Sequence, residues 1–277
     1  MQELHIKSAL LTLVVILNLI LQGYSIGDET RIGAREVAMG NSSVALVSVF
    51  SVFNNQAALA RISHFTTALD YQQPFRIKGY SQKSLALVIP AKLASFGVSL
   101  KQKGILNYNE TRMGLALARN FGPEFSAGIQ FNYFMMDFPE QGSQRGTFLI
   151  ECGMLYELTN KLLIGIHLFN PAHATIESRN LTAIFPLRLT TGFSLKPSSN
   201  FLLSSAFDYC SEIPFQICFG IEYQLANRFF LRCGVSGKPI RHSVGFGYKY
   251  KFLAFDFALV HHDNLGYTPS ICLTLNL

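Results

Sequence analysis

The sequence predicts an all-β fold, a fourteen-stranded antiparallel transmembrane β-barrel with an N-terminal hatch segment inside the lumen. The first observation behind this prediction is alternation. In Phe215–Leu225 apolar side chains occupy every second position, and Gln, Cys, Gly and Glu occupy the positions between them. Because successive side chains of a strand point to opposite faces, one face of such a strand suits lipid and the other suits a polar interior.

The second observation is the composition. The 277 residues have a mean hydropathy of +0.25, and only 14% of them are charged, whereas about 25% are charged in soluble domains. Beyond the N-terminus no apolar run reaches the roughly 18 residues of a helical membrane span. A closed barrel satisfies its backbone groups in lipid without such helices. The net charge of +6 forms no basic stripe with interleaved aromatic residues, so we expect no nucleic-acid partner.

The chain is expected to divide into three parts. Residues 1–25 have the features of a cleavable signal peptide: Lys7, the apolar stretch Ala9–Leu21 and the small-x-small end Gly23-Tyr24-Ser25. An uncleaved anchor helix is the alternative. Residues 26–62 are the hatch, rich in Gly, Ala and Ser and too short for a domain of its own. Residues 63–277 are the barrel, and the protein is expected in the bacterial outer membrane.

The barrel strands follow one another at short intervals along the chain. They are expected at His64–Tyr71, Gln82–Ile89, Leu93–Lys103, Thr111–Asn120, Glu124–Asp137, Thr147–Leu158, Lys161–Phe169, Phe185–Lys196, Asn200–Cys210, Phe215–Leu225, Arg228–Ser236, Arg241–Tyr250, Phe252–His262 and Ser270–Leu277. Bacterial outer-membrane barrels of one chain have an even number of strands.

The third observation is the length of the connections. Every second link is a tight turn rich in Gly, Pro, Asn and Ser, such as Phe121-Gly122-Pro123, Thr159-Asn160 and Pro197-Ser198-Ser199. The links between them are mostly longer, namely Gln72–Ser81, Gly104–Glu110, Phe138–Gly146, Asn170–Ile184 and Asp263–Pro269. Short periplasmic turns opposite longer outer loops are typical of outer-membrane barrels.

The inward positions carry charges of both signs and many glycines. The polar set is Glu151, Arg188, Asp208, Glu222, Arg232, Lys249, Asp256 and His167. An isolated buried charge is costly, so we expect these groups to pair. Inward glycines leave room for a segment that approaches closely. The set is therefore interpreted as salt bridges that hold a plug, with a gating or ligand-orienting network as the alternative.

The sequence gives little support for catalysis or for a metal site. His261-His262 lack a third ligand at a usable spacing. A hydrolase would need Ser194 or Ser204 beside His167, and no G-x-S-x-G motif is present. The five cysteines lie singly within strands, without a CxxC pair. We expect no enzyme activity, no metal and no cofactor.

Two stretches of the hatch resemble the N-terminal signature of FadL-type outer-membrane proteins, and within them the PorV/PorQ-like branch linked to type IX secretion. The signature reads GAR-x-x-x-MG-x-x-x-VAL, followed after a gap by N-P-A-G-L-A. The matching residues are Gly33, Ala34, Arg35, Met39, Gly40, Val44, Ala45, Leu46, Asn55, Ala57, Leu59 and Ala60. Gln56 and Ala58 depart from it, and the chain ends in Leu277 where such barrels usually end in an aromatic residue.

The resemblance implies a non-enzymatic component of type IX protein secretion and surface attachment. Its partners would be outer-membrane lipid and secretion components or their cargo. The alternative is a FadL-like transport channel with a hydrophobic small molecule as ligand. An exposed apolar patch on the loops favours the first function, and an apolar pocket leading into the lumen favours the second.

Overall fold

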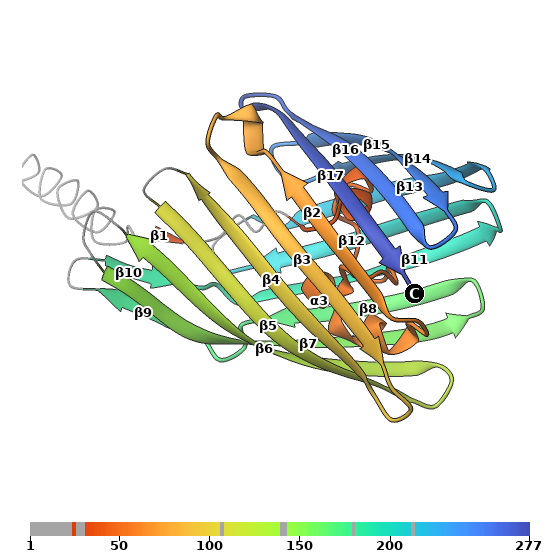
Figure 1. The fold of residues 1–277 in the computed structure, drawn as a ribbon, viewed down its shortest axis with the longest axis horizontal. Coiled ribbons are helices and arrows are strands. Elements are labelled where there is room, and N and C mark those ends of the chain that lie inside the picture. Colours follow the sequence, from red (N-terminus) through yellow and green to blue (C-terminus); the bar gives the residue numbers. More distant parts are fainter. Residues whose placement is uncertain (1–23, 26–30, 106–107, 139–142, 179–180, 212–213) are drawn as a thin grey trace, which may run out of the picture.

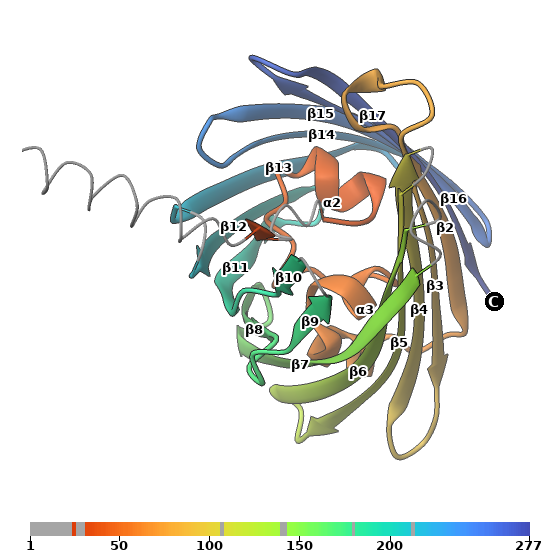
Figure 2. The same ribbon diagram turned by 90° about the vertical axis from the view of Figure 1, so that its left-hand side faces the viewer.

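The computed structural model describes residues 24–25, 31–105, 108–138, 143–178, 181–211 and 214–277. Fourteen strands form a closed antiparallel barrel, which confirms the predicted fold (Figures 1 and 2). They are β2 (Thr66–Gln72), β3 (Ser81–Pro90), β4 (Ser95–Ile105), β5 (Tyr108–Phe121), β6 (Phe125–Phe138), β7 (Ser143–Thr159), β8 (Leu162–Phe169), β11 (Arg188–Ser198), β12 (Phe201–Cys210), β13 (Gln216–Ala226), β14 (Phe229–Ser236), β15 (Arg241–Tyr250), β16 (Leu253–His262) and β17 (Gly266–Asn276).

Each barrel strand pairs with its neighbours in the chain, and β17 pairs with β2 to close the sheet. The short turns, such as the one between β5 and β6, lie together at one end, which we call the short-turn end. The opposite end is called the loop end. The predicted signal peptide lies outside the described residues except for Tyr24 and Ser25, and so do residues 26–30 of the hatch. The three-part division of the chain stays a prediction.

The structure corrects several predicted loops. The stretch expected as a loop at residues 170–184 contains β9 (Thr175–Ser178) and β10 (Leu181–Ile184), which pair antiparallel, with β1 (Tyr24–Ser25) alongside β10. Elsewhere strands run on into predicted loops, since Ile105 pairs with Tyr108 and Met135 pairs with Gly146. Backbone ladder bonds need no side-chain alternation, so the sequence pattern ends before the pairing does.

The outer face of the barrel is apolar. Phe148, Leu115 and Phe131 are among the most exposed large side chains and lie on the outward parity of their strands, as the alternation predicted. The inward parity of the same strands is buried, for example Glu151 on β7 and Gly114 on β5. No helix in the described part of the chain combines the length and the hydropathy that a membrane crossing requires.

Residues 31–62, called the N-terminal segment below, pack inside the ring of strands (Figure 2). The segment contains α2 (Ala34–Ala38), α3 (Ser51–Asn54) and the 3-10 helix η1 (Gln56–Arg61). A second 3-10 helix, η2 (Pro74–Arg76), follows β2. The helix α2 contacts β14 to β17, whereas η1 contacts β3 to β7 on the other side of the lumen. The segment therefore bridges the two halves of the barrel.

Glycines on the inner face make this close packing possible. A Cβ atom at Gly234 would collide with the backbone of Met39 and Gly40, and one at Gly220 would collide with Met39. The backbone of the N-terminal segment thus lies directly against β13 and β14, where any larger residue would displace it.

Candidate functional site

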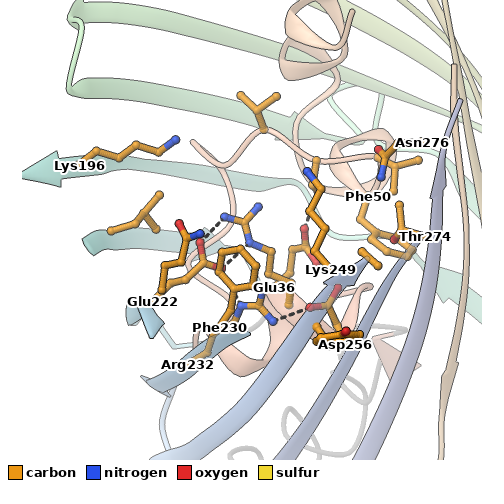
Figure 3. A pocket seen from close by; sticks show the side chains of 18 of the residues that line it. Glu36, Phe50, Lys196, Glu222, Phe230, Arg232, Lys249, Asp256, Thr274 and Asn276 are labelled. Carbon is orange, nitrogen blue, oxygen red and sulfur yellow. Dashed lines mark hydrogen bonds and ion pairs between the residues drawn. The ribbon is translucent and has the colours of Figure 1, made fainter. Parts of the chain in front are cut away.

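A cavity of about 390 Å³ lies in the lumen at the short-turn end (Figure 3). One wall is the N-terminal segment, with Arg35 and Phe50. The others come from β11 to β17, with side chains such as Glu222 and Lys249. Asn200, in the turn between β11 and β12, also lines the cavity. The volume falls in the range of about 300–1,000 Å³ that is usual for small-molecule sites.

A chain of ion pairs runs along this cavity. The guanidinium of Arg35 donates to both carboxylate oxygens of Glu222, at 2.8 and 2.7 Å. Arg232 donates through Nε to the same carboxylate at 2.6 Å and through Nη1 to Asp256 at 2.6 Å. Two carboxylates and two guanidiniums thus alternate, and Figure 3 shows the row from β13 to β16. Arg35 fastens the N-terminal segment to this row.

Strand register explains why these residues meet. Glu222 on β13 and Arg232 on β14 are direct cross-strand partners. Asp256 lies on β16, so Arg232 reaches it across β15. The residue of β15 beside Asp256 is Gly247, and a Cβ atom there would lie 2.5 Å from the carboxylate and 2.7 Å from the guanidinium. Glycine at this position keeps open the space in which the pair forms.

The cavity is lined by more cations than carboxylates. Four cations line it, Arg35, Lys196, Arg232 and Lys249, against the three carboxylates of Glu36, Glu222 and Asp256. Among the described residues no carboxylate pairs with Lys196 or Lys249, both of which Figure 3 shows at the cavity. Apolar walls adjoin these charges, from Val47, Val49, Phe50, Phe201, Leu202, Phe230, Tyr248 and Ala254.

The carboxyl of Glu36 on α2 is buried beside the cavity. Its Oε1 accepts a hydrogen bond from the hydroxyl of Ser48, and its Oε2 has no hydrogen-bond partner among the described residues. Burial raises the pKa of Glu36 above its usual range, although Arg35 and the Ser48 hydrogen bond oppose the shift. The protonated form is therefore favoured more than it would be in water.

A second polar cluster is centred on Glu151, away from the cavity. Its carboxylate accepts from Asn132 Nδ2 at 2.9 Å and from Gln56 Nε2 at 3.0 Å, and it lies 2.9 Å from His167 Nε2. Arg112 is 3.5 Å away. Gln56 belongs to η1, so this cluster also ties the N-terminal segment to the barrel.

The predicted lumen set therefore separates into three groups. Glu222, Arg232 and Asp256 meet at the cavity, where Lys249 stands without an ion pair among the described residues. Glu151 and His167 meet at the second cluster. Arg188 and Asp208 meet near the loop end, where Arg31 also lies 3.8 Å from Asp208.

The sequence prediction missed three members of these groups. Arg35 was identified as a motif residue and not as an ion-pair partner. Arg112 shares the inward parity of Gly114 on β5, so the alternation contained a signal for it. Arg31 precedes the motif, and nothing in the sequence marks it.

The residues considered for a hydrolase or a metal site do not come together in the structure. Ser194 donates to the backbone of Ala45 at 2.9 Å, and Ser204 contacts Ser42, so both serines hold the N-terminal segment and not His167. His261 lies 3.7 Å from the carboxylate of Asp263 at the loop end. In the part of the chain that the structure describes, no group of three metal-ligating side chains occurs and all five cysteines are free.

Other motif residues lie at the contacts of the N-terminal segment with the barrel. Gly33 and Gly40 have positive φ angles, which glycine adopts without strain. Asn55 donates through Nδ2 to the carbonyls of Val44 at 2.7 Å and Met154 at 3.0 Å. Ala34, Met39, Asn55, Ala57 and Leu59 of the motif are fully buried.

A smaller cavity of about 50 Å³ lies on the loop-end side of α2. Val37, Asn41, Phe75 and Val260 are among its lining residues. Arg35 and Glu36 line the larger cavity. Residues 35–41 of the N-terminal segment therefore lie between the two cavities.

The chain therefore folds as a closed fourteen-stranded β-barrel with an N-terminal segment in its lumen. Solved structures of this fold are similar along nearly the whole chain. The Ralstonia pickettii toluene transporter TbuX has a TM-score of 0.65 at 14% identity, and the match covers 88% of this chain and 98% of TbuX. The Pseudomonas putida toluene transporter TodX has a TM-score of 0.64 at 13% identity, with 93% and 99% covered.

A Pseudomonas aeruginosa FadL homologue is similar to the same degree, with a TM-score of 0.65 at 13% identity and coverage of 88% and 97%. At these identities the likeness shows the fold. No protein-family model matches the sequence, and no curated protein matches it significantly. The PorV/PorQ-like assignment stays a prediction.

Proposed function

We propose that this protein is a bacterial outer-membrane channel for hydrophobic small molecules, the second of the two functions considered from the sequence. The observation that carries the proposal is the pair of cavities on opposite sides of residues 35–41, within a barrel of this fold. The similar proteins TbuX and TodX are toluene transporters, which supports a small apolar cargo. None of the similar structures named above is described as an enzyme.

In this proposal the cargo enters at the loop end, where Val37, Phe75 and Val260 line the small cavity. Residues 35–41 then move aside. The cargo reaches the larger cavity, where Phe50 and Phe230 offer apolar contact, and leaves at the short-turn end. The two cavities are thus the entry and exit sides of one route.

The contacts of residues 35–42 define what must be released. Arg35 is paired with Glu222, and Gly40 lies against Gly234. Ser243 Oγ donates to the carbonyl of Ala38 at 3.1 Å. The helix α2 also packs against β14 to β17, so in this proposal residues 35–42 slip along these strands while η1 stays attached to β3–β7.

A disulfide lock tests this route. The hydroxyl oxygens of Ser42 and Ser204 are 2.5 Å apart, close to the separation of about 2.05 Å that a disulfide needs. We introduce Ser42→Cys and Ser204→Cys after replacing the five native cysteines with alanine. Uptake of radiolabelled toluene and related hydrocarbons into cells that display the protein is then measured, with and without reductant.

We expect oxidation to reduce uptake to that of cells without the protein, and reductant to restore it. The Ser42→Cys single variant is the control and should transport under both conditions. Equal transport by the oxidised and reduced double variant would show that residues 35–42 are not the barrier. Failure of the unlocked protein to transport any compound of the series would contradict the channel function itself.

The second candidate is the role in type IX secretion and surface attachment. It is favoured by the hatch signature, from Gly33-Ala34-Arg35 through Met39-Gly40. Affinity purification from the native membrane distinguishes the two. Recovery of secretion components in stoichiometric amounts would support this role over the channel.

A further inference from the structure

The outer surface of the barrel has a groove of about 590 Å³ at the short-turn end of β3 to β6, on the opposite side of the wall from the lumen. Its sides are large apolar residues, Leu93, Phe96, Leu117, Phe121 and Ile129. Small residues, Ala91, Ala94 and Ala127, also line it. An apolar groove of this kind on a barrel wall fits a hydrocarbon chain lying along the strands.

One cation lies in this groove. The outward positions of β5 carry Met113, Leu115 and Leu117, and the next outward residue is Arg119. Its guanidinium lies 5.6 Å from the ring centroid of Phe121, and no carboxylate among the described residues pairs with it. Its direct cross-strand partner is Ala127, which also lines the groove.

The depth of Arg119 indicates which ligand it meets. The turn at Gly122 follows three residues later, so Arg119 lies near the membrane surface. There a lipid-facing arginine costs only about 0–1 kcal/mol, against about 2–4 kcal/mol at the midplane. A guanidinium offers a planar fork of donors that matches phosphate oxygens. An apolar groove with a phosphate-binding cation at its headgroup end fits a phospholipid, whereas an uncharged hydrocarbon would use only the groove.

We propose that this groove is a binding site for a phospholipid of the leaflet on the short-turn side, with an acyl chain along Phe96, Leu117 and Ile129 and the phosphate on Arg119. The proposal requires the barrel to span a membrane. It does not depend on what the lumen transports, so the failure of one proposal leaves the other intact.

Native mass spectrometry of the detergent-solubilised full chain with added phosphatidylglycerol tests the site. Two variants change the two parts of the site separately: Arg119→Gln removes the charge, and Ala127→Phe fills the groove. The matched control is Arg228→Gln, since Arg228 also lies over an aromatic ring, that of Tyr250 at 5.2 Å, and belongs to a short turn outside the groove. Folding of each variant is verified by its heat-dependent gel mobility.

We expect one retained phospholipid on the wild type and on Arg228→Gln. Arg119→Gln should bind about tenfold more weakly, as for the loss of one charge-assisted hydrogen bond of about 1.5 kcal/mol. Ala127→Phe should also bind more weakly, because its ring occupies the space of the acyl chain. Equal retention by all four proteins would overturn the proposal. Equal retention of a diacylglycerol with the same acyl chains would overturn the phosphate assignment, because that lipid has no charge for Arg119 to recognise.

Discussion

Glu222 is the residue on which the cavity-side contacts converge. Its carboxylate accepts from two guanidiniums, one on the N-terminal segment and one on the barrel. Arg232 has a second carboxylate partner in Asp256, whereas Arg35 has no second carboxylate at ion-pair distance among the described residues. The two partners of Glu222 are therefore unequal. Replacing Arg35 leaves Glu222 with one guanidinium partner, whereas replacing Glu222 leaves Arg35 without a carboxylate among the described residues.

This inequality predicts an order of stability. Glu222→Gln leaves Arg35 without a carboxylate and should destabilise the protein by about 3 kcal/mol, the usual cost of breaking a buried pair from one side. Arg35→Gln leaves Glu222 with Arg232 and should cost about 1 kcal/mol. Urea unfolding of the protein in lipid vesicles measures both. A larger loss for Arg35→Gln than for Glu222→Gln would show that the Arg232 contact does not compensate.

At the scale of elements, alternation predicted all fourteen barrel strands because lipid and lumen impose opposite requirements on the two faces. Alternation did not predict the structure where an inward position is apolar or where a strand does not belong to the barrel wall. Leu155 is apolar yet faces inward, where it packs against Ala57 and Ala58 of η1. The strands β9 and β10 belong to a separate three-stranded sheet and not to the barrel wall, so the alternation between lipid and lumen does not apply to them.

The candidate site was less predictable than the strands. Alternation placed Glu222, Arg232 and Asp256 on the inner face, since parity is a local property. The contact of Arg35 with Glu222 joins residues 187 positions apart. It depends on where the N-terminal segment enters the barrel, which a single sequence does not encode as a pattern.

The helix α2 should respond to pH through Glu36. Its pKa is raised in the folded protein, so the folded state binds the proton more tightly than the unfolded chain does. The resulting stability is fully present below the ordinary pKa of glutamate and is lost as the pH rises through the raised value. Arg35 opposes this loss, and Asp256 adds to it.

Glu36→Gln should therefore be more stable than the wild type at about pH 8 and similar to it at about pH 4, because the amide does not titrate. Ser48 can still donate to the amide oxygen, so the variant keeps that contact. Thermal unfolding across this range measures the difference. A constant difference between the two proteins at all pH values would show that the pKa of Glu36 is the same in the folded and unfolded states.

At the scale of the whole molecule, the barrel has reversed the usual arrangement of a soluble protein. Its large apolar side chains are exposed on the outer face, and many of its charges are buried inside against the N-terminal segment. Exposure alone does not distinguish a lipid-facing residue from one facing water. Depth along the strand does, because the cost of a charge in a bilayer falls from the midplane to the surface.

Two leucines of similar exposure provide this test. Leu115, in the middle of β5, is 67% exposed, and Leu225, at the short-turn end of β13, is 62% exposed. In a bilayer Leu115→Arg should cost about 2–4 kcal/mol and Leu225→Arg about 0–1 kcal/mol. The folded fraction in vesicles, read from heat-dependent gel mobility over a urea series, gives both values. In water the same two substitutions would replace similarly exposed leucines, and both would have little effect on stability. Equal losses of stability would therefore contradict the assignment of the barrel to a membrane, on which both proposed sites depend.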